Sequence, residues 1–137
     1  MPSRTAFLSK LLGLYCILVA LSMMTHKQLT VDTVTAVLHN APLLLFLGVI
    51  TTLGGLAMIL AHNVWSGGAL PVVVTVLGWL TLIKGLLFLF LSPETESNLF
   101  LGGLHYAQYF YGYVCFSLLL GVYLTYGGFS STARQSA

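Results

Sequence analysis

Charged residues are scarce in this sequence. Of its 137 residues, five are Lys or Arg and three are Asp or Glu, so that 6% are charged while 58% are hydrophobic. A soluble domain carries about 25% charged residues, because its surface must be hydrated. The scarcity therefore excludes a soluble domain, and the lack of a basic patch excludes nucleic-acid binding. We expect an integral membrane protein that is surrounded by the lipid bilayer.

Catalytic patterns are missing as well. The sequence has no pair of carboxylates within an apolar segment, no Ser/His/Asp arrangement and no Gly-rich phosphate loop. The two cysteines, Cys16 and Cys115, both fall in apolar segments, where we interpret them as small hydrophobic residues. The sequence thus predicts no enzyme and no metal site, and it identifies no cofactor.

Four long apolar segments dominate the chain. They cover residues 5–25, 43–61, 70–91 and 104–126, and a helix of that length crosses a hydrocarbon core of about 30 Å. None shows the alternating polarity of a barrel strand. The sequence predicts an all-α fold in one domain, an antiparallel bundle of four transmembrane helices, with a short interfacial helix at residues 30–40.

The first apolar segment also has features of a signal peptide. Arg4 and Lys10 precede its apolar core, and Ala20-Leu21-Ser22 resembles a cleavage site. The apolar stretch continues beyond that site through Met23 and Met24, so we interpret the segment as a transmembrane helix.

The few cations predict an orientation. Arg4, Lys10 and Arg134 lie on the side that holds both termini, whereas Lys27 lies on the other side. Because cytoplasmic loops carry an excess of Lys and Arg, the pattern favours cytoplasmic termini.

Lys84 is the only charged residue deep within a predicted span, since Lys10 lies near the start of the first span, before its dense apolar part. Ionisable residues inside a membrane are costly and are candidates for function. One alternative is a structural role, in which the lysine stem extends to the interface or pairs with Glu94 or Glu96. The other alternative is a role in transport, proton transfer or ligand binding.

The aromatic residues of the fourth segment suggest a contact surface. Tyr106, Tyr109 and Tyr113 fall on one helix face, with Phe110 beside them. Tyrosines gather at membrane interfaces, so anchoring and packing is one interpretation. The other is a face that docks a partner subunit, a lipid head group or a quinone.

His39 and His105 are weak candidates for cofactor ligands on the predicted outer side. Asp32, Glu94 and Glu96 could complete a metal site there, but the spacings His-x-x-His and Glu-x-x-His do not occur. The alternative is that these histidines bond backbone carbonyls at helix ends.

Small residues at helical spacing predict where the helices pack closely. They are Gly48, Thr52 and Gly55 in the second segment, Gly78 and Gly85 in the third, and the pairs Gly103/Ala107 and Ser117/Gly121 in the fourth.

The central hairpin carries a recurrent pattern. It runs from Gly54-Gly55-Leu56 through His62-Asn63-Val64-Trp65 and Gly78-Trp79-Leu80 to Lys84-Gly85-Leu86. With this pattern, residues 43–93 resemble a family of small uncharacterised bacterial integral membrane proteins. The resemblance implies a bacterial inner membrane location and four helices, and no activity. From the residues themselves we expect a tight hairpin, in which His62 and Asn63 bond carbonyls, Trp65 anchors the turn and the glycines permit close crossing.

Three functions remain open at this point. The first is a non-catalytic accessory subunit that packs against a larger membrane complex, and it fits the lack of catalytic groups best. The second is a homo-oligomeric transporter of a small solute or ion that uses Lys84. The third is a haem, pigment or quinone binder that uses His39, His105 and the tyrosines of the fourth segment. The expected partners are other membrane subunits or a second copy of the chain.

Overall fold

The structure, a computed structural model, describes residues 2–135 and contains no β-strand in that range. Its elements are α1 (Pro2–Thr25), α2 (Lys27–Leu38), α3 (Ala41–Ala61), α4 (Ala69–Phe90), α5 (Pro93–Ser97), the π-helical turn η1 (Asn98–Gly103) and α6 (Phe110–Gln135). Four of the helices, α1, α3, α4 and α6, are long and apolar enough to cross a membrane. The prediction of an all-helical fold with four long apolar helices is therefore confirmed.

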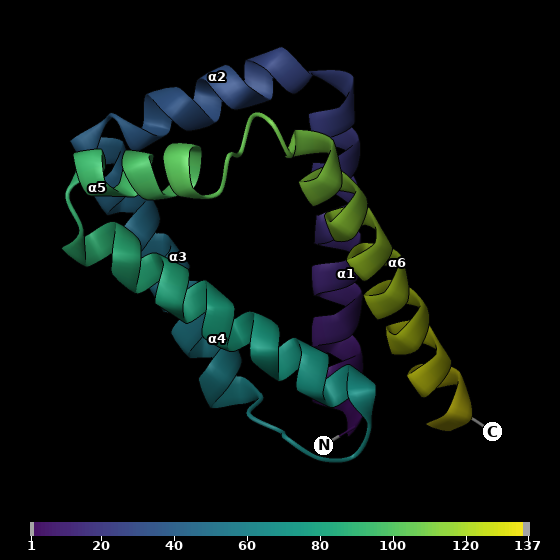
Figure 1. Cartoon of the computed structure of the whole chain (residues 1–137). Coiled ribbons are helices and arrows are strands. Elements are labelled where there is room, and N and C mark those ends of the chain that lie inside the picture. The colour runs from purple at the N-terminus through teal and green to yellow at the C-terminus, as the bar shows by residue number, and fades with distance from the viewer. Residues whose placement is uncertain (1, 136–137) are drawn as a thin grey trace.

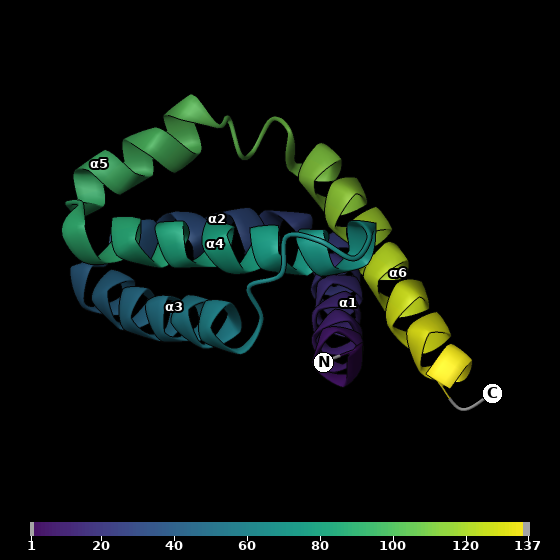
Figure 2. The ribbon, with the colours of Figure 1, turned by 90° about the horizontal axis from the view of Figure 1, so that it is seen from below.

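The long helices lie as two pairs, α1 with α6 and α3 with α4 (Figure 1). The pairs approach each other at the end that holds both chain termini, where Leu70 of α4 lies next to Gly127 of α6. At the opposite end α2 and α5 lie across the space between the pairs. Figure 2 shows α5 on the far side of α4 from α3. The packing is thus looser than the single bundle of four that we expected.

Small residues form the seam between α1 and α6. A methyl group added at Gly121 would lie 2.9 Å from the Gly13 carbonyl oxygen, so no larger side chain fits at this crossing. Nearby, the Ser117 hydroxyl donates a hydrogen bond to the Cys16 carbonyl at 3.5 Å. The seam predicted at Ser117 and Gly121 is confirmed.

The seam between α3 and α4 follows the same principle. Gly55 lies against the backbone of Leu82, and Gly85 lies against that of Thr52. Gly78 is less tight, since a methyl group there would lie 3.3 Å from the Met58 side chain. Close backbone approach lets the two helices gain dispersion contacts along their length, as the sequence predicted.

The fourth long helix begins later than expected. We predicted a span over 104–126, but α6 begins at Phe110, and residues 104–109 are irregular. Gly102 and Gly103 weaken a helix at this point, and His105 adopts a left-handed backbone conformation with φ of 47°. The prediction that Gly103 and Ala107 share a helical seam is therefore wrong. The other three spans, and the short helix predicted at 30–40, match helices within three residues at each end.

Helix α2 connects the two pairs through two hydrophobic clusters. Val31 packs against the first cluster, which holds Ala20 of α1 with Phe110 and Val114 of α6. At its other end, α2 contributes Leu38 to a second cluster with Leu44 of α3 and Phe88 of α4. Burial of these apolar side chains holds α2 in place across both pairs.

Candidate functional site

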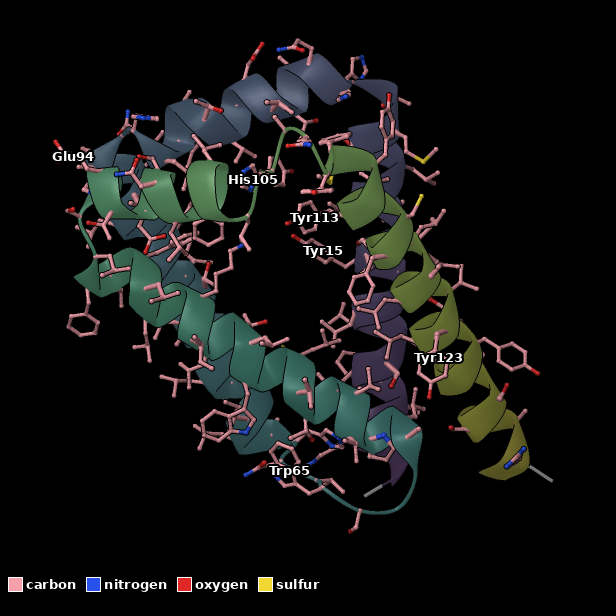
Figure 3. The ribbon with its side chains drawn as sticks, viewed as in Figure 1. Tyr15, Trp65, Glu94, His105, Tyr113 and Tyr123 are labelled. Atoms are coloured by element: carbon pink, nitrogen blue, oxygen red, sulfur yellow. The ribbon has the colours of Figure 1, made fainter. Side chains whose placement is uncertain are left out.

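A cavity of about 290 Å³ lies between α2, α4, η1 and the beginning of α6. We call it the lysine cavity, and its lining residues are Val34, Leu38, Lys84, Phe88, Phe100, Leu104, Tyr106 and Tyr113. The lining is apolar and aromatic except for one ammonium group and two tyrosine hydroxyls. Figure 3 shows Tyr113 of α6 extending toward the space between the helix pairs.

Lys84 contributes the only charged group that lines this cavity. Its Nζ atom lies 5.4 Å from the centre of the Phe88 ring, within the range of a cation–π contact. Phe88 lies one helical turn further along α4, so the lysine stem extends toward the helix end that faces α5. Of the two alternatives for Lys84, its place in the cavity wall fits ligand binding, and its direction fits partial extension toward the interface.

Glu96 of α5 is buried close to this lysine. Its side chain has no exposed surface, and neither carboxylate oxygen has a hydrogen-bond partner among residues 2–135. Burial raises the pKa of the Glu96 carboxyl, and the positive charge of Lys84 acts in the opposite direction. Of the two carboxylates proposed as partners of Lys84, Glu96 is therefore the one within its electrostatic range. Glu94 is exposed and lies at the outer edge of the molecule (Figure 3).

The short helix α5 positions this carboxylate. The Ser92 side chain caps its first turn by accepting a hydrogen bond from the Thr95 N–H at 3.4 Å, and Pro93 occupies the first helical position, where its missing N–H is tolerated. At the other end the Ser97 hydroxyl donates to the Glu94 carbonyl at 3.0 Å. These local bonds fix the turn that places Glu96 inward.

The four aromatic residues predicted to share one face are divided among three environments. Phe110 is fully buried in the cluster with Ala20. Tyr106 stacks on Tyr113 with ring centres 5.8 Å apart, and both line the lysine cavity. Tyr109 is 58% exposed. The spacing argument fails because residues 104–109 are not helical, so that Tyr106 and Tyr109 do not follow the period of α6.

A shallow hollow of about 460 Å³ lies along the first turns of α6. We call it the α6 hollow, and Tyr109, Gly112, Tyr113 and Phe116 line it. Gly112 faces open space there, since a methyl group added to it would meet no atom within 4 Å. Phe116, at one rim, is 67% exposed.

The histidines named as possible cofactor ligands lie outside the lysine cavity. The His39 Nδ1 atom lies 2.8 Å from the Thr35 carbonyl oxygen, and the His105 Nδ1 atom lies 3.3 Å from that of Gly103. Each exposed ring thus contacts a carbonyl of its own segment, as the second interpretation predicted. In the described part of the chain no three His, Cys, Asp or Glu side chains could together hold a metal ion.

The hairpin between α3 and α4 lies at the opposite end of the molecule, where Figure 3 shows Trp65. His62 ends α3 and is buried, with Nε2 3.3 Å from the Pro71 carbonyl oxygen and Nδ1 3.5 Å from the Thr5 hydroxyl. The Trp65 indole donates to Asn63 Oδ1 at 2.8 Å. These bonds order the hairpin and join it to α1. Trp79, in contrast, is partly exposed on α4.

Sequence reasoning missed the role of Thr75 in this hairpin. Its buried hydroxyl accepts a hydrogen bond from the Val64 N–H at 3.0 Å. The hydroxyl can donate to the carbonyl of Val64 at 2.9 Å or to that of Pro71 at 3.0 Å. A threonine in an apolar helix commonly bonds the carbonyl one turn earlier, and that signal predicts Pro71. The bonds to Val64 depend on how the loop folds back.

No family model, no curated protein and no solved structure matches this chain, so the resemblance of residues 43–93 to a family stays an expectation. We therefore infer function from the geometry of the chain itself.

Proposed function

We propose that the chain is a non-catalytic integral membrane protein of the bacterial inner membrane and an accessory subunit of a larger membrane complex. In this proposal α1, α3, α4 and α6 span the bilayer in antiparallel order. Their length and apolar character support spanning. The contacts of Gly13 with Gly121, and of Ala6 with Gly128, support opposite directions for α1 and α6. The resemblance of residues 43–93 to bacterial membrane proteins supports the location.

The α6 hollow is the observation that carries the subunit proposal. Glycines at the seams of this chain have a neighbouring helix against them, as Gly121 and Gly85 show, whereas Gly112 has none. In lipid, helices associate where small residues allow close approach. The hollow lies along the first two turns of α6, a length of about 10 Å that matches the diameter of one crossing helix. We therefore propose that a transmembrane helix of another subunit occupies it.

Site-specific crosslinking tests this occupant. A photoreactive amino acid at Phe116 should crosslink the chain in its native membranes to one apolar helix of a single partner. The same group at Leu53, an exposed position of α3, serves as the control and should not capture that helix. Gly112→Leu fills the hollow and should abolish the crosslink from Phe116, while Gly54→Leu, which also meets open space, should preserve it. Crosslinks only to lipid, or a crosslink unaffected by Gly112→Leu, would overturn the proposal.

The proposed orientation has the termini and the hairpin loop in the cytoplasm, supported by Arg4, Lys10 and Arg134. In a chain with both native cysteines replaced by alanine, a single cysteine at Ser66 or at Glu94 reports on which side of the membrane that loop lies. A membrane-impermeant maleimide added to intact spheroplasts should label Glu94→Cys and should label Ser66→Cys only after lysis. The reverse pattern contradicts the orientation, and labelling of both from outside contradicts the spans.

A transporter that uses Lys84 is the second candidate, because the lysine lines a cavity rather than a helix seam. Four helices do not easily enclose a path for a solute, so this function requires a homo-oligomer. Flux of a small solute or ion into proteoliposomes that contain the purified chain should then disappear in Lys84→Met. Absence of flux with the parent chain across anionic, cationic and neutral solutes removes this candidate.

A further inference from the structure

The lysine cavity has one cation, Lys84, in an otherwise apolar and aromatic wall. Lys84 contacts the Phe88 ring, and it is not hydrogen-bonded to the nearby Glu96, whose oxygens have no partner in residues 2–135. The Lys84 residue is exposed at the surface of the chain, so in the proposed bilayer its charge would meet hydrocarbon. A charge in apolar surroundings without a hydrogen-bonded counter-ion carries a large desolvation cost. An anion that enters the cavity would reduce this cost.

A second donor lies in the same wall. The Tyr113 hydroxyl already donates to the Leu104 carbonyl at 2.8 Å, but the half-buried Tyr106 hydroxyl, on the ring stacked against Tyr113, has no such bond to another described residue. The Lys84 ammonium supplies up to three donors and the Tyr106 hydroxyl supplies one. Together they match a compact anionic head group with several acceptor oxygens.

The remaining walls are suited to hydrocarbon. Leu38, Phe88 and Phe100 pack together around the cavity, and the Phe88 and Phe100 rings lie 5.6 Å apart. The volume of about 290 Å³ is at the small end of ligand pockets, which measure about 300–1,000 Å³. It accommodates a single chain rather than two.

We propose that the lysine cavity binds a single-chain amphiphile with one anionic head group, which Lys84 and Tyr106 hold while the chain lies against Phe88 and Phe100. The ligand would enter from the bilayer, so the inference rests on the proposed membrane location. It does not require the partner subunit, because all of the lining residues belong to this chain.

Glu96 competes with such a ligand for the same cation. The charged and titratable groups on the surrounding elements are Lys27 and Asp32 on α2, His39 after it, Lys84 on α4, Glu94 on α5, His105 and Tyr106 after η1, and Tyr113 on α6. Of these charges, that of Lys84 acts on Glu96. Burial raises the pKa of Glu96, so at acidic pH the carboxyl is neutral and Lys84 is available to the ligand. As the pH rises and Glu96 ionises, it attracts Lys84 and weakens ligand binding.

Native mass spectrometry of the purified full chain in an uncharged detergent tests the site. Dodecyl sulfonate is the probe, since its charge does not change between pH 5 and pH 8. One molecule of dodecyl sulfonate should bind per chain, and it should bind more tightly at pH 5 than at pH 8. Uncharged dodecanol should bind at least about tenfold more weakly than dodecyl sulfonate. At pH 8, dodecanoate and phosphatidylglycerol distinguish a free fatty acid from a membrane lipid, and we expect dodecanoate to bind and the two-chain lipid not to. Equal binding of dodecanol, or preference for phosphatidylglycerol, would overturn the proposal.

Variants separate ligand binding from a merely structural role. Lys84→Met keeps the length of the side chain and should weaken dodecyl sulfonate binding about tenfold. Lys27→Met is the matched control, because it removes a lysine at the same end of the molecule but outside the cavity, and it should bind as the parent does. Glu96→Gln should raise binding at pH 8 to the level at pH 5 and abolish the pH dependence. If Lys84→Met does not fold, the gain in binding at pH 8 in Glu96→Gln still tests the proposal. A pH dependence that is unchanged in Glu96→Gln contradicts the proposal.

Discussion

Gly85 of α4 lies directly against the backbone of Thr52 of α3. A methyl group added at Gly85 would lie 2.5 Å from the Thr52 backbone nitrogen. Atoms that are not bonded to each other do not approach this closely. The contact fixes how closely α3 and α4 approach, and therefore where Lys84, the residue before Gly85, lies relative to α5.

Gly85→Val should separate α3 from α4. The added side chain meets backbone that cannot move aside, so we expect a loss of about 1–3 kcal/mol in the free energy of unfolding. Gly54→Val is the control, because it makes the same change within a helix but has no atom within 4 Å of the added group. Unfolding in detergent, followed by helical circular dichroism, measures both. An equal loss in the two variants would contradict the role assigned to the seam.

Thr75→Val should destabilise the hairpin loop. The substitution removes the acceptor for the Val64 N–H and leaves that donor partly buried without a partner, at a cost of about 1–3 kcal/mol. Thr81→Val is the comparison, since the Thr81 hydroxyl only donates within its own helix, to the Leu77 carbonyl at 2.7 Å. The difference between their melting temperatures isolates the loop contact, and no difference would mean that Thr75 does not order the loop.

Tyr113→Phe should release the irregular segment 104–109. The hydroxyl bond to the Leu104 carbonyl spans nine residues, and its loss removes about 1 kcal/mol, or roughly a fivefold change in an opening equilibrium. Hydrogen exchange of the backbone amides in this segment should accelerate accordingly. Tyr123, which Figure 3 shows on the same helix, provides the control, and Tyr123→Phe should leave the exchange unchanged.

The buried Glu96 carboxyl should make stability depend on pH. Its pKa in the folded protein is raised above the ordinary value of about 4.3, so the folded chain binds more protons than the unfolded chain between these two values. Stability should then be greatest at acidic pH and fall as the pH rises through the raised pKa. Glu96→Gln should flatten this part of the profile of melting temperature against pH. A profile in which Glu96→Gln changes nothing would show that the carboxyl is not buried in solution.

The helix seams show why part of this architecture was predictable. Ser117 and Gly121, or Gly55 and Gly85, lie in long apolar segments where a small side chain has one main use, namely close approach of another helix. Such a signal is local. It does not say which helix approaches, and the pairing of α1 with α6 across nearly the whole chain came only from the structure.

The aromatic segment shows where prediction failed. The assumption of one continuous helix placed Tyr106, Tyr109 and Tyr113 on a shared face, but α6 begins only at Phe110. Two glycines and the left-handed backbone of His105 interrupt it. When the predicted start of a helix is wrong, the predicted directions of the side chains before the true start are wrong as well, because those residues do not follow the helical period.

The sequence by itself determined that the chain is helical, that four segments are long and apolar enough to span a bilayer, and that Lys84 is the one charge far from the ends of those segments. These properties follow from composition and local periodicity. The tertiary structure decided that Lys84 lines a cavity, that Glu96 is buried within its electrostatic range, and that Gly112 of α6 has no neighbouring helix against it, unlike Gly121 of the same helix. Those facts depend on how distant segments pack, and the energy of a charge or of a small residue in lipid depends on what lies beside it rather than on its position along the chain.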